Sequence, residues 1–425
     1  MTPGLSYAQA PPFSLPLRFF LTAPLFLLAA GGLIACAPEA LASRWTPAAL
    51  ALAHALTLGF LGQTMLGALT QVLPVVAGAP LPFVRPVARF AHVALAGGTA
   101  ALLAGFLTAA PLAAGVALVL LGAGIMVFLA ALAASLVRAA RGPTTAGVRL
   151  ASLALLLVAV LGGMLAWPRA GGAYPPNLPL LIDTHLAFGL LGWILLLVVA
   201  VALQVVPMFQ ITPVYPAWLA RGLPALLFAL LLLRSAAQAL PAFAGAALDA
   251  GIAFGVLAFA LVTLDLQRRR RRRLADTTLD FWRLAMVSLI ACVAAWSVAR
   301  AVPAWAAHDA YPLLLGVLFL GGFATSVVSG MLYKIVPFLA WFHLQSQLQA
   351  RAGSIPTMKD MIAEGRTRLH FRLHLSACLL LALATAWPQL VRPAGIVLVL
   401  SAALQGANLH SAVARFKRHG GRLGA

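Results

Sequence analysis

Long apolar runs separated by short polar breaks make up almost the whole chain. A helix of about 20 residues spans the roughly 30 Å hydrocarbon core of a bilayer, and the runs reach or exceed that length. They are continuous and do not alternate, which predicts helices and not the strands of a barrel. The expected spans are 17–37, 46–75, 86–109, 112–138, 147–168, 180–208, 217–238, 243–266, 279–302, 311–338, 368–388 and 391–413. We therefore expect an all-α integral membrane protein of about twelve transmembrane helices.

Composition agrees with this prediction, because 63% of the residues are hydrophobic and only 9% are charged, whereas soluble domains carry roughly a quarter of their residues as charge. The net charge of +20 does not call for a nucleic-acid partner, since the basic residues gather in alternate loops. Those loops contain Arg85, Arg89, Arg138, Arg141, Arg149, Arg221, the run 268–273, and the segments 351–368 and 415–422. The positive-inside rule assigns them to the cytoplasm. We expect a bacterial inner membrane protein with both termini cytoplasmic.

Three of the expected spans share one pattern, a Gly-aromatic pair followed at constant spacing by a polar residue and, three positions later, a proline. The copies are Gly59 and Phe60 with Gln71 and Pro74, Gly192 and Trp193 with Gln204 and Pro207, and Gly322 and Phe323 with Lys334 and Pro337. Successive copies are separated by close to a third of the chain, which indicates an internal repeat. We expect one transmembrane domain over 1–425, built from pseudo-threefold four-helix repeats at about 17–138, 147–266 and 279–413.

Gln71, Gln204 and Lys334 are the polar residues of this pattern. The proline after each one frees backbone carbonyls one turn earlier. Polar side chains and free carbonyls at membrane depth are tolerated only against protein or a polar cavity. The three residues therefore either line the interior or lie at the headgroup level, with Lys334 extending to the interface.

Two histidines lie at similar depth in repeat-related helices. His54 precedes Gly59 and His185 precedes Gly192, and their depths differ by roughly 3 Å at 1.5 Å per residue. Imidazole is the side chain here most suited to a haem iron or another metal. The sequence favours two interpretations, a ligand pair and an interhelical hydrogen-bonding role.

Other polar residues are weaker candidates. Arg234 and Arg300 lie towards the outer side and either bind haem propionates or cap helix carbonyls. His370 and His374 are one helical turn apart, a spacing that would suit a second metal. We find no Ser-His-Asp set, phosphate loop or carboxylate pair in the sequence, so hydrolase and kinase chemistry have no support.

With these features the chain resembles the haem-copper oxidase subunit I superfamily, especially its short divergent members and the NnrS-type proteins of nitric oxide response. The segments that carry the resemblance are 16–20, 54–74, 185–207 and 330–343. The resemblance implies twelve helices in three arcs, His54 as a low-spin haem ligand, and His185 at the place of a copper ligand. The usual adjacent histidines are missing from 217–238 and the usual HxH pair from 311–338. A dioxygen-reducing centre is therefore not expected.

Three functions follow as hypotheses. The first is a haem-binding or metal-binding protein linked to respiration or nitric oxide, with haem b as cofactor, copper or another metal as the alternative, and a respiratory subunit or electron donor as partner. The second is a permease with Gln71, Gln204 and Lys334 along its path, although secondary transporters more often show twofold repeats. The third is a cofactor-free accessory or assembly protein. The lipid bilayer is a partner in all three.

Overall fold

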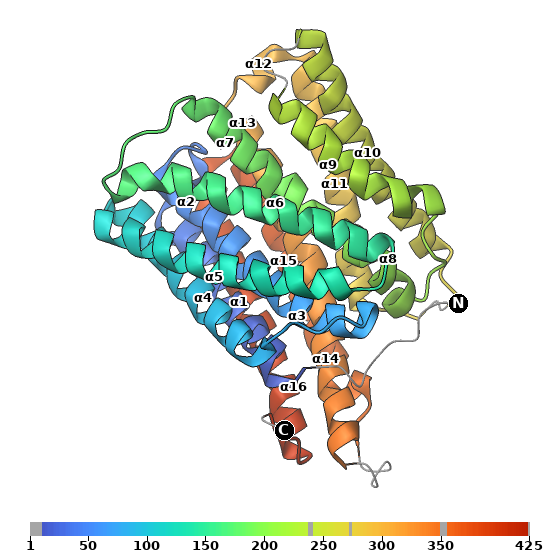
Figure 1. Ribbon diagram of the computed structural model, residues 1–425. Coiled ribbons are helices and arrows are strands. Elements are labelled where there is room, and N and C mark those ends of the chain that lie inside the picture. Colours follow the sequence, from blue (N-terminus) through green and yellow to red (C-terminus); the bar gives the residue numbers. More distant parts are fainter. Residues whose placement is uncertain (1–10, 237–240, 272–273, 349–354, 424–425) are drawn as a thin grey trace.

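The computed structural model describes residues 11–236, 241–271, 274–348 and 355–423, and within these ranges all the regular structure is helical. Figure 1 shows a bundle of long helices, with α14 and α16 extending furthest at its lower end. The longer helices are α1 (Ser14–Cys36), α3 (Gln63–Ala77), α4 (Val84–Thr108), α5 (Pro111–Arg138), α6 (Pro143–Ala166), α8 (Leu196–Gln210), α9 (Ala217–Ala236), α10 (Ala242–Arg268), α11 (Thr277–Ala301), α14 (Ser326–Leu348), α15 (Glu364–Ala384) and α16 (Val391–Arg418). The shorter ones are α2 (Pro47–His54), α7 (Leu178–Ala187), α12 (Pro303–Ala306) and α13 (Ala310–Gly316), with 3₁₀ turns at η2 (Pro38–Leu41), η4 (Trp167–Ala170), η9 (Met358–Met361) and η10 (Pro388–Leu390).

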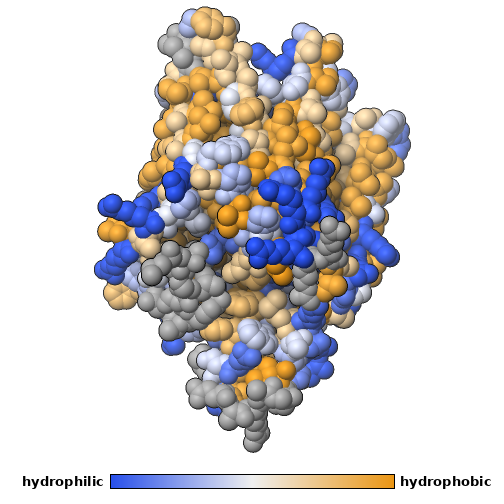
Figure 2. Space-filling model, turned by 90° about the vertical axis from the view of Figure 1, so that its right-hand side faces the viewer, coloured by the Kyte–Doolittle hydropathy of each residue, from blue (hydrophilic) through white to orange (hydrophobic). Residues whose placement is uncertain are grey.

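Eleven helices in the described part of the chain are long and apolar enough to cross a membrane. The twelfth expected span, 368–388, corresponds to α15, which is not among the eleven and carries Glu364, Arg366, Arg368 and Arg372 in its first half. Large apolar side chains such as Leu112 lie exposed on the outside. Figure 2 shows hydrophobic side chains over most of the upper part of one face, with many of the hydrophilic ones gathered lower down. The protein is a polytopic membrane protein that contacts the lipid bilayer.

The three helices that share the Gly-aromatic pattern each change to π-helical geometry around that pair. These segments are η3 (Ala55–Gly62) between α2 and α3, η5 (Phe188–Leu195) between α7 and α8, and η7 (Val317–Thr325) between α13 and α14. π-helical turns are rare and occur often at functional sites. In this protein each one follows a short helix of ten residues or fewer, α2, α7 or α13.

The glycine of each pair allows a neighbouring helix to approach. A Cβ atom on Gly192 would lie 3.0 Å from the Cβ of Ala154 in α6. A Cβ on Gly59 would overlap the Phe26 ring of α1, and one on Gly322 would overlap the side chain of Ser288 in α11. The repeated glycine is therefore a packing requirement at three helix crossings.

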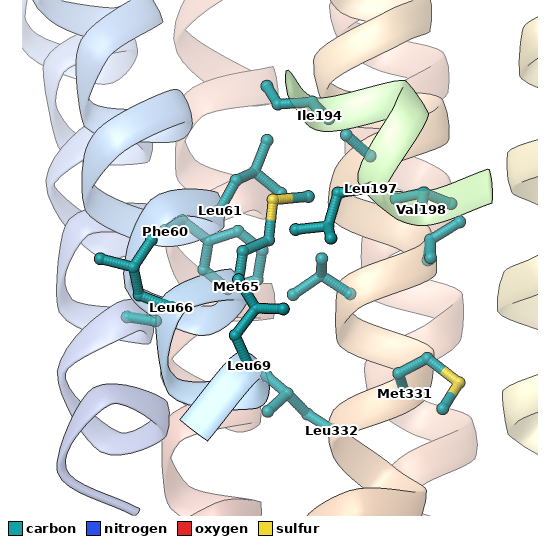
Figure 3. Packing of buried hydrophobic residues seen from close by; sticks show 14 of the residues in the cluster. Phe60, Leu61, Met65, Leu66, Leu69, Ile194, Leu197, Val198, Met331 and Leu332 are labelled. Atoms are coloured by element: carbon teal, nitrogen blue, oxygen red, sulfur yellow. The ribbon is translucent and has the colours of Figure 1, made fainter. Parts of the chain in front are cut away.

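Below the π-helical segments the three central helices pack against one another through apolar side chains (Figure 3). Met65 and Leu69 of α3, Leu197 of α8 and Leu332 of α14 belong to one buried cluster and are at most 5% exposed. Interiors of this kind are close-packed. Apolar side chains therefore fill the centre of the bundle below the π-helical segments.

The polar residues that precede the three prolines have different surroundings. Gln71 is 7% exposed and its Oε1 atom is buried without a hydrogen-bond partner. Gln204 is partly buried. The Nζ atom of Lys334 lies 2.9 Å from a carboxylate oxygen of Asp276, and both side chains are 21% exposed. Asp276 also caps α11, since its carboxylate accepts a hydrogen bond from the backbone N–H of Thr278.

Candidate functional site

A cavity of about 1250 Å³ lies among the helices that carry the π-helical segments. Ligand pockets in proteins usually measure about 300–1,000 Å³, so this cavity has room for a large cofactor. Residues from η3, η5 and η7 all line it, and most of the lining side chains are apolar. Exposed residues such as Tyr174 also line it, which places its mouth at the bundle end where the loop before α7 lies.

His54 and His185 are neighbours in the lining of this cavity. Their ring centroids are 6.4 Å apart, the ring planes are inclined by 20°, and both residues line the cavity. His54 is the last residue of α2 and His185 lies two residues before the end of α7, so each shortly precedes a π-helical segment. The two histidines that the sequence singled out are therefore neighbours in the folded protein.

The hydrogen bonds of these rings leave a nitrogen available on each. The Nδ1 atom of His54 lies 2.8 Å from the Leu50 carbonyl oxygen, so Nδ1 carries the proton and donates, and Nε2 keeps its lone pair. The Nδ1 atom of His185 is buried without a hydrogen-bond partner. Buried polar atoms are seldom left unsatisfied in folded proteins. His185 therefore has bonding capacity that the described residues do not use.

The distance between the ring centroids matches that of two imidazoles bound to one metal ion. Imidazole nitrogens bind metals at about 2.0–2.1 Å, and a ring nitrogen lies about 1.1 Å from its ring centroid, so two opposed ligands have centroids about 6.3 Å apart. The observed value is 6.4 Å. Within the described residues no group of three or more His, Cys, Asp or Glu side chains is placed to hold a metal ion. Two histidine ligands suit a metal ion whose other coordination positions are filled by the cofactor that contains it.

Aromatic and cationic side chains surround the histidine pair. The ring of Phe106 packs on His54 with centroids 5.1 Å apart, and the Arg169 guanidinium lies 5.0 Å from the Phe106 ring centroid. Arg44 lies over the Trp45 ring at 4.2 Å. Both arginines are exposed and both line the cavity. The cavity lining therefore carries two exposed guanidinium groups, and that of Arg169 lies beside the Phe106 ring that packs on His54.

Of the two arginines selected from the sequence, only Arg234 lines the cavity, and its Nε atom is 2.7 Å from a carboxylate oxygen of Asp249. Arg300 is exposed in the last turn of α11 and is not among the lining residues. Sequence reasoning missed Arg44 and Arg169. The available signal was their position, because each precedes a histidine-bearing helix on the same side of the bundle.

The remaining sequence candidates lie elsewhere. Gln71, Gln204 and Lys334 are not among the lining residues of the cavity. His370 and His374 are buried in α15, with ring centroids 6.1 Å apart, and form hydrogen bonds with residues of α14. His374 also lines the far end of the cavity.

No known protein family has a model that matches this chain, and no curated protein matches it.

Proposed function

We propose that this chain is a haem-binding membrane protein in which His54 and His185 ligate the iron of one haem, b-type in its simplest form, from opposite sides. The observation that carries the proposal is the 6.4 Å separation of the two rings beside a cavity of about 1250 Å³. The hydrogen bond from His54 to the Leu50 carbonyl orients the ligand ring, as partners of metal-bound histidines commonly do.

The charge of the site supports an anionic cofactor. Arg44 and Arg169 lie at the mouth, whereas the third lining arginine, Arg234, is already paired with Asp249. Guanidinium groups match carboxylates in geometry. The apolar walls favour the apolar macrocycle and keep water from the ligand nitrogens. A bound haem would supply one-electron transfer and, on loss of one histidine, a binding position for a small gas molecule.

The proposal also includes the scaffold, the membrane and the topology of the protein. Twelve transmembrane helices in three repeats, an oxidase-like scaffold, a bacterial inner membrane and cytoplasmic termini would place this haem near the outer side. The repeat is supported by the three π-helical segments at equivalent positions. A role in respiration or nitric oxide response, with an electron donor or respiratory subunit as partner, follows from the resemblance and the expected cofactor. Among the described residues, a site for copper or another metal alone would have no group of three or more His, Cys, Asp or Glu ligands.

The test is an optical spectrum of the detergent-purified protein, oxidised and reduced, with haem and metal content measured on the same sample. We expect near-stoichiometric haem with the sharp reduced bands of an iron bound by two histidines. His54→Ala and His185→Ala should each lose that signature. His410→Ala is the control, since His410 is exposed and its Nδ1 atom bonds only the Gly406 carbonyl of its own helix.

The ligand assignment also predicts a change in the reduction potential of the haem iron. His54→Met keeps a ligand at the same position but replaces imidazole by thioether, which raises the reduction potential of a haem iron. A colourless, metal-free protein expressed with ample haem would refute the proposal. It would leave the accessory and permease functions as the remaining explanations.

A further inference from the structure

Buried polar side chains form a stripe along each of three neighbouring helices, α14, α15 and α16. In each helix the polar positions are three or four residues apart and therefore share one face. They are Ser326, Ser329 and Tyr333 in α14, Thr367, His370 and His374 in α15, and Ser401, Gln405 and Asn408 in α16. Each is at most 8% exposed. We call these nine residues the polar column.

Four hydrogen bonds join residues of the column across the helices, in three separate groups. The Nε2 atom of His374 lies 2.8 Å from the Ser326 hydroxyl, and the Nδ1 atom of His370 lies 2.9 Å from the Tyr333 hydroxyl. Asn408 donates to the Tyr333 hydroxyl at 2.9 Å. Gln405 donates to the Ser329 hydroxyl at 3.2 Å.

The column begins at the cavity, and its lowest members lie toward the basic end of α15 and α16, which carries Arg366 and Arg415. At the upper end, His374 lines the cavity together with Thr325 and Cys378. At the lower end, the Thr367 hydroxyl lies 3.1 Å from that of Thr277 in α11 and donates to the Glu364 carbonyl.

The ring packed on the column's two histidines is apolar, and the ion pairs of the surrounding elements lie near its lower end, while Arg372 of α15 is exposed. The Phe281 ring of α11 packs on both histidines, with centroids 5.2 Å from His370 and 5.4 Å from His374. The ion pair of Lys334 and Asp276 and the exposed pair of Arg368 and Glu364 lie on the elements around the lower end. The two ion pairs therefore lie toward the lower end of the column.

Several column atoms are buried with bonding capacity that no described residue satisfies. They are Nε2 of His370, Nδ1 of His374, Oγ of Ser401, Oε1 of Gln405 and Oδ1 of Asn408, with Oγ1 of Thr325 beside them. In folded proteins such atoms bond ordered water. The two unpartnered imidazole nitrogens belong to neighbouring rings, and hydrogen-bonded water bridges separations of this kind.

We propose that the polar column is a hydrated path that transfers protons between the cavity and the basic end of α15 and α16. Hydroxyl and imidazole groups both donate and accept. A proton that arrives at one nitrogen of a neutral imidazole is matched by release of the proton on its other nitrogen, so no net charge stays on the ring. Polar residues inside membrane proteins commonly mark such relays.

The alternative is that these bonds only hold α14, α15 and α16 together. Tyr333→Phe separates the two cases, because it keeps the ring and removes only the hydroxyl that bonds His370. Tyr215→Phe is the matched control. Tyr215 is 5% exposed, against 8% for Tyr333, and its hydroxyl bonds Thr263 outside the column.

The measurement is proton uptake into vesicles of defined phospholipid that contain the full-length protein and a pH-sensitive dye, driven by a potassium diffusion potential. We expect wild type and Tyr215→Phe to conduct above protein-free vesicles. Tyr333→Phe and His374→Asn should conduct about tenfold less or lower, since a positioned proton-transfer group contributes at least that factor. Size-exclusion elution and melting temperature verify that each variant is folded.

Flux equal to protein-free vesicles in wild type, or equal flux in wild type and Tyr333→Phe, would overturn the proposal. The proposal uses the cavity and not the haem. If haem is absent or His54→Ala removes it and flux remains, the proton path stands without the haem assignment. If haem is present and flux is absent, only the proton path fails.

Discussion

Substitution of Gly162 tests the histidine pair without touching either ligand. A Cβ on Gly162 in α6 would lie 3.0 Å from the Cε1 atom of His185, whereas ordinary contacts of this kind measure 3.4–4 Å. The imidazole would therefore have to move by about 0.4 Å, which exceeds the tolerance of roughly 0.2 Å on ligand distances in metal sites.

We expect Gly162→Ala to weaken haem binding by about tenfold, the lower end of the range for residues that orient metal ligands. Gly162→Val adds methyl groups towards the ring and should resemble His185→Ala. Gly163→Ala is the matched control, because its Cβ would meet only the side chain of Leu118, at 3.8 Å. Both alanines should be neutral or favourable to the helix, by up to about 1 kcal/mol.

The assay is haem content and the reduced spectrum after equal purification, with melting temperature on the haem-free protein. Lower haem retention in Gly162→Ala at unchanged or higher stability would show a displaced ligand and not a damaged fold. If Gly162→Ala and Gly163→Ala retain haem equally, the reasoning that links Gly162 to His185 is wrong.

Three further outcomes are expected. Lys334→Gln should lower the free energy of unfolding by about 1 kcal/mol, because the partly exposed ion pair with Asp276 is lost. Asp276→Asn in the same chain should recover part of that loss. Thermal unfolding in detergent measures both variants. Gly395→Leu should destabilise the protein by about 3 kcal/mol or more, since its Cβ would lie 2.5 Å from a backbone nitrogen of α1; an unchanged melting temperature would contradict this. Arg169→Gln should weaken haem retention severalfold and Arg300→Gln should not, because only Arg169 lines the cavity; titration of haem into the purified protein compares them.

The sequence indicated part of the candidate site through repeated motifs, in addition to the apolar runs that predict the helices. The repeated Gly-aromatic pair marked the three helices that carry π-helical segments, and the placement of His54 and His185 before it put them at similar depth. The arginines that line the cavity were harder to identify from the sequence. Arg300 and Arg169 are both basic residues near the ends of apolar runs, and only the path of the loops distinguishes the one beside the cavity.

The sequence also left the surroundings of the two α15 histidines undecided. Their spacing predicted that His370 and His374 share a face, and the charges before them left open whether that face meets solvent. The structure buries both against α14 and α11. The polar stripes of α14 and α16 were not selected, because serine, glutamine and asparagine in an apolar run carry no signal until a second stripe lies opposite.

The sequence by itself determined that this protein is helical and membrane-embedded, because hydrocarbon around a long apolar run requires every backbone hydrogen bond to be satisfied within the run. It also determined which helices carry repeated glycines and histidines. Only the tertiary structure decided that two imidazole rings lie 6.4 Å apart, that Arg44 and Arg169 lie at the cavity mouth, and that polar stripes of three helices face one another. Those relations depend on the rotation and crossing of helices, which side-chain packing between distant segments sets.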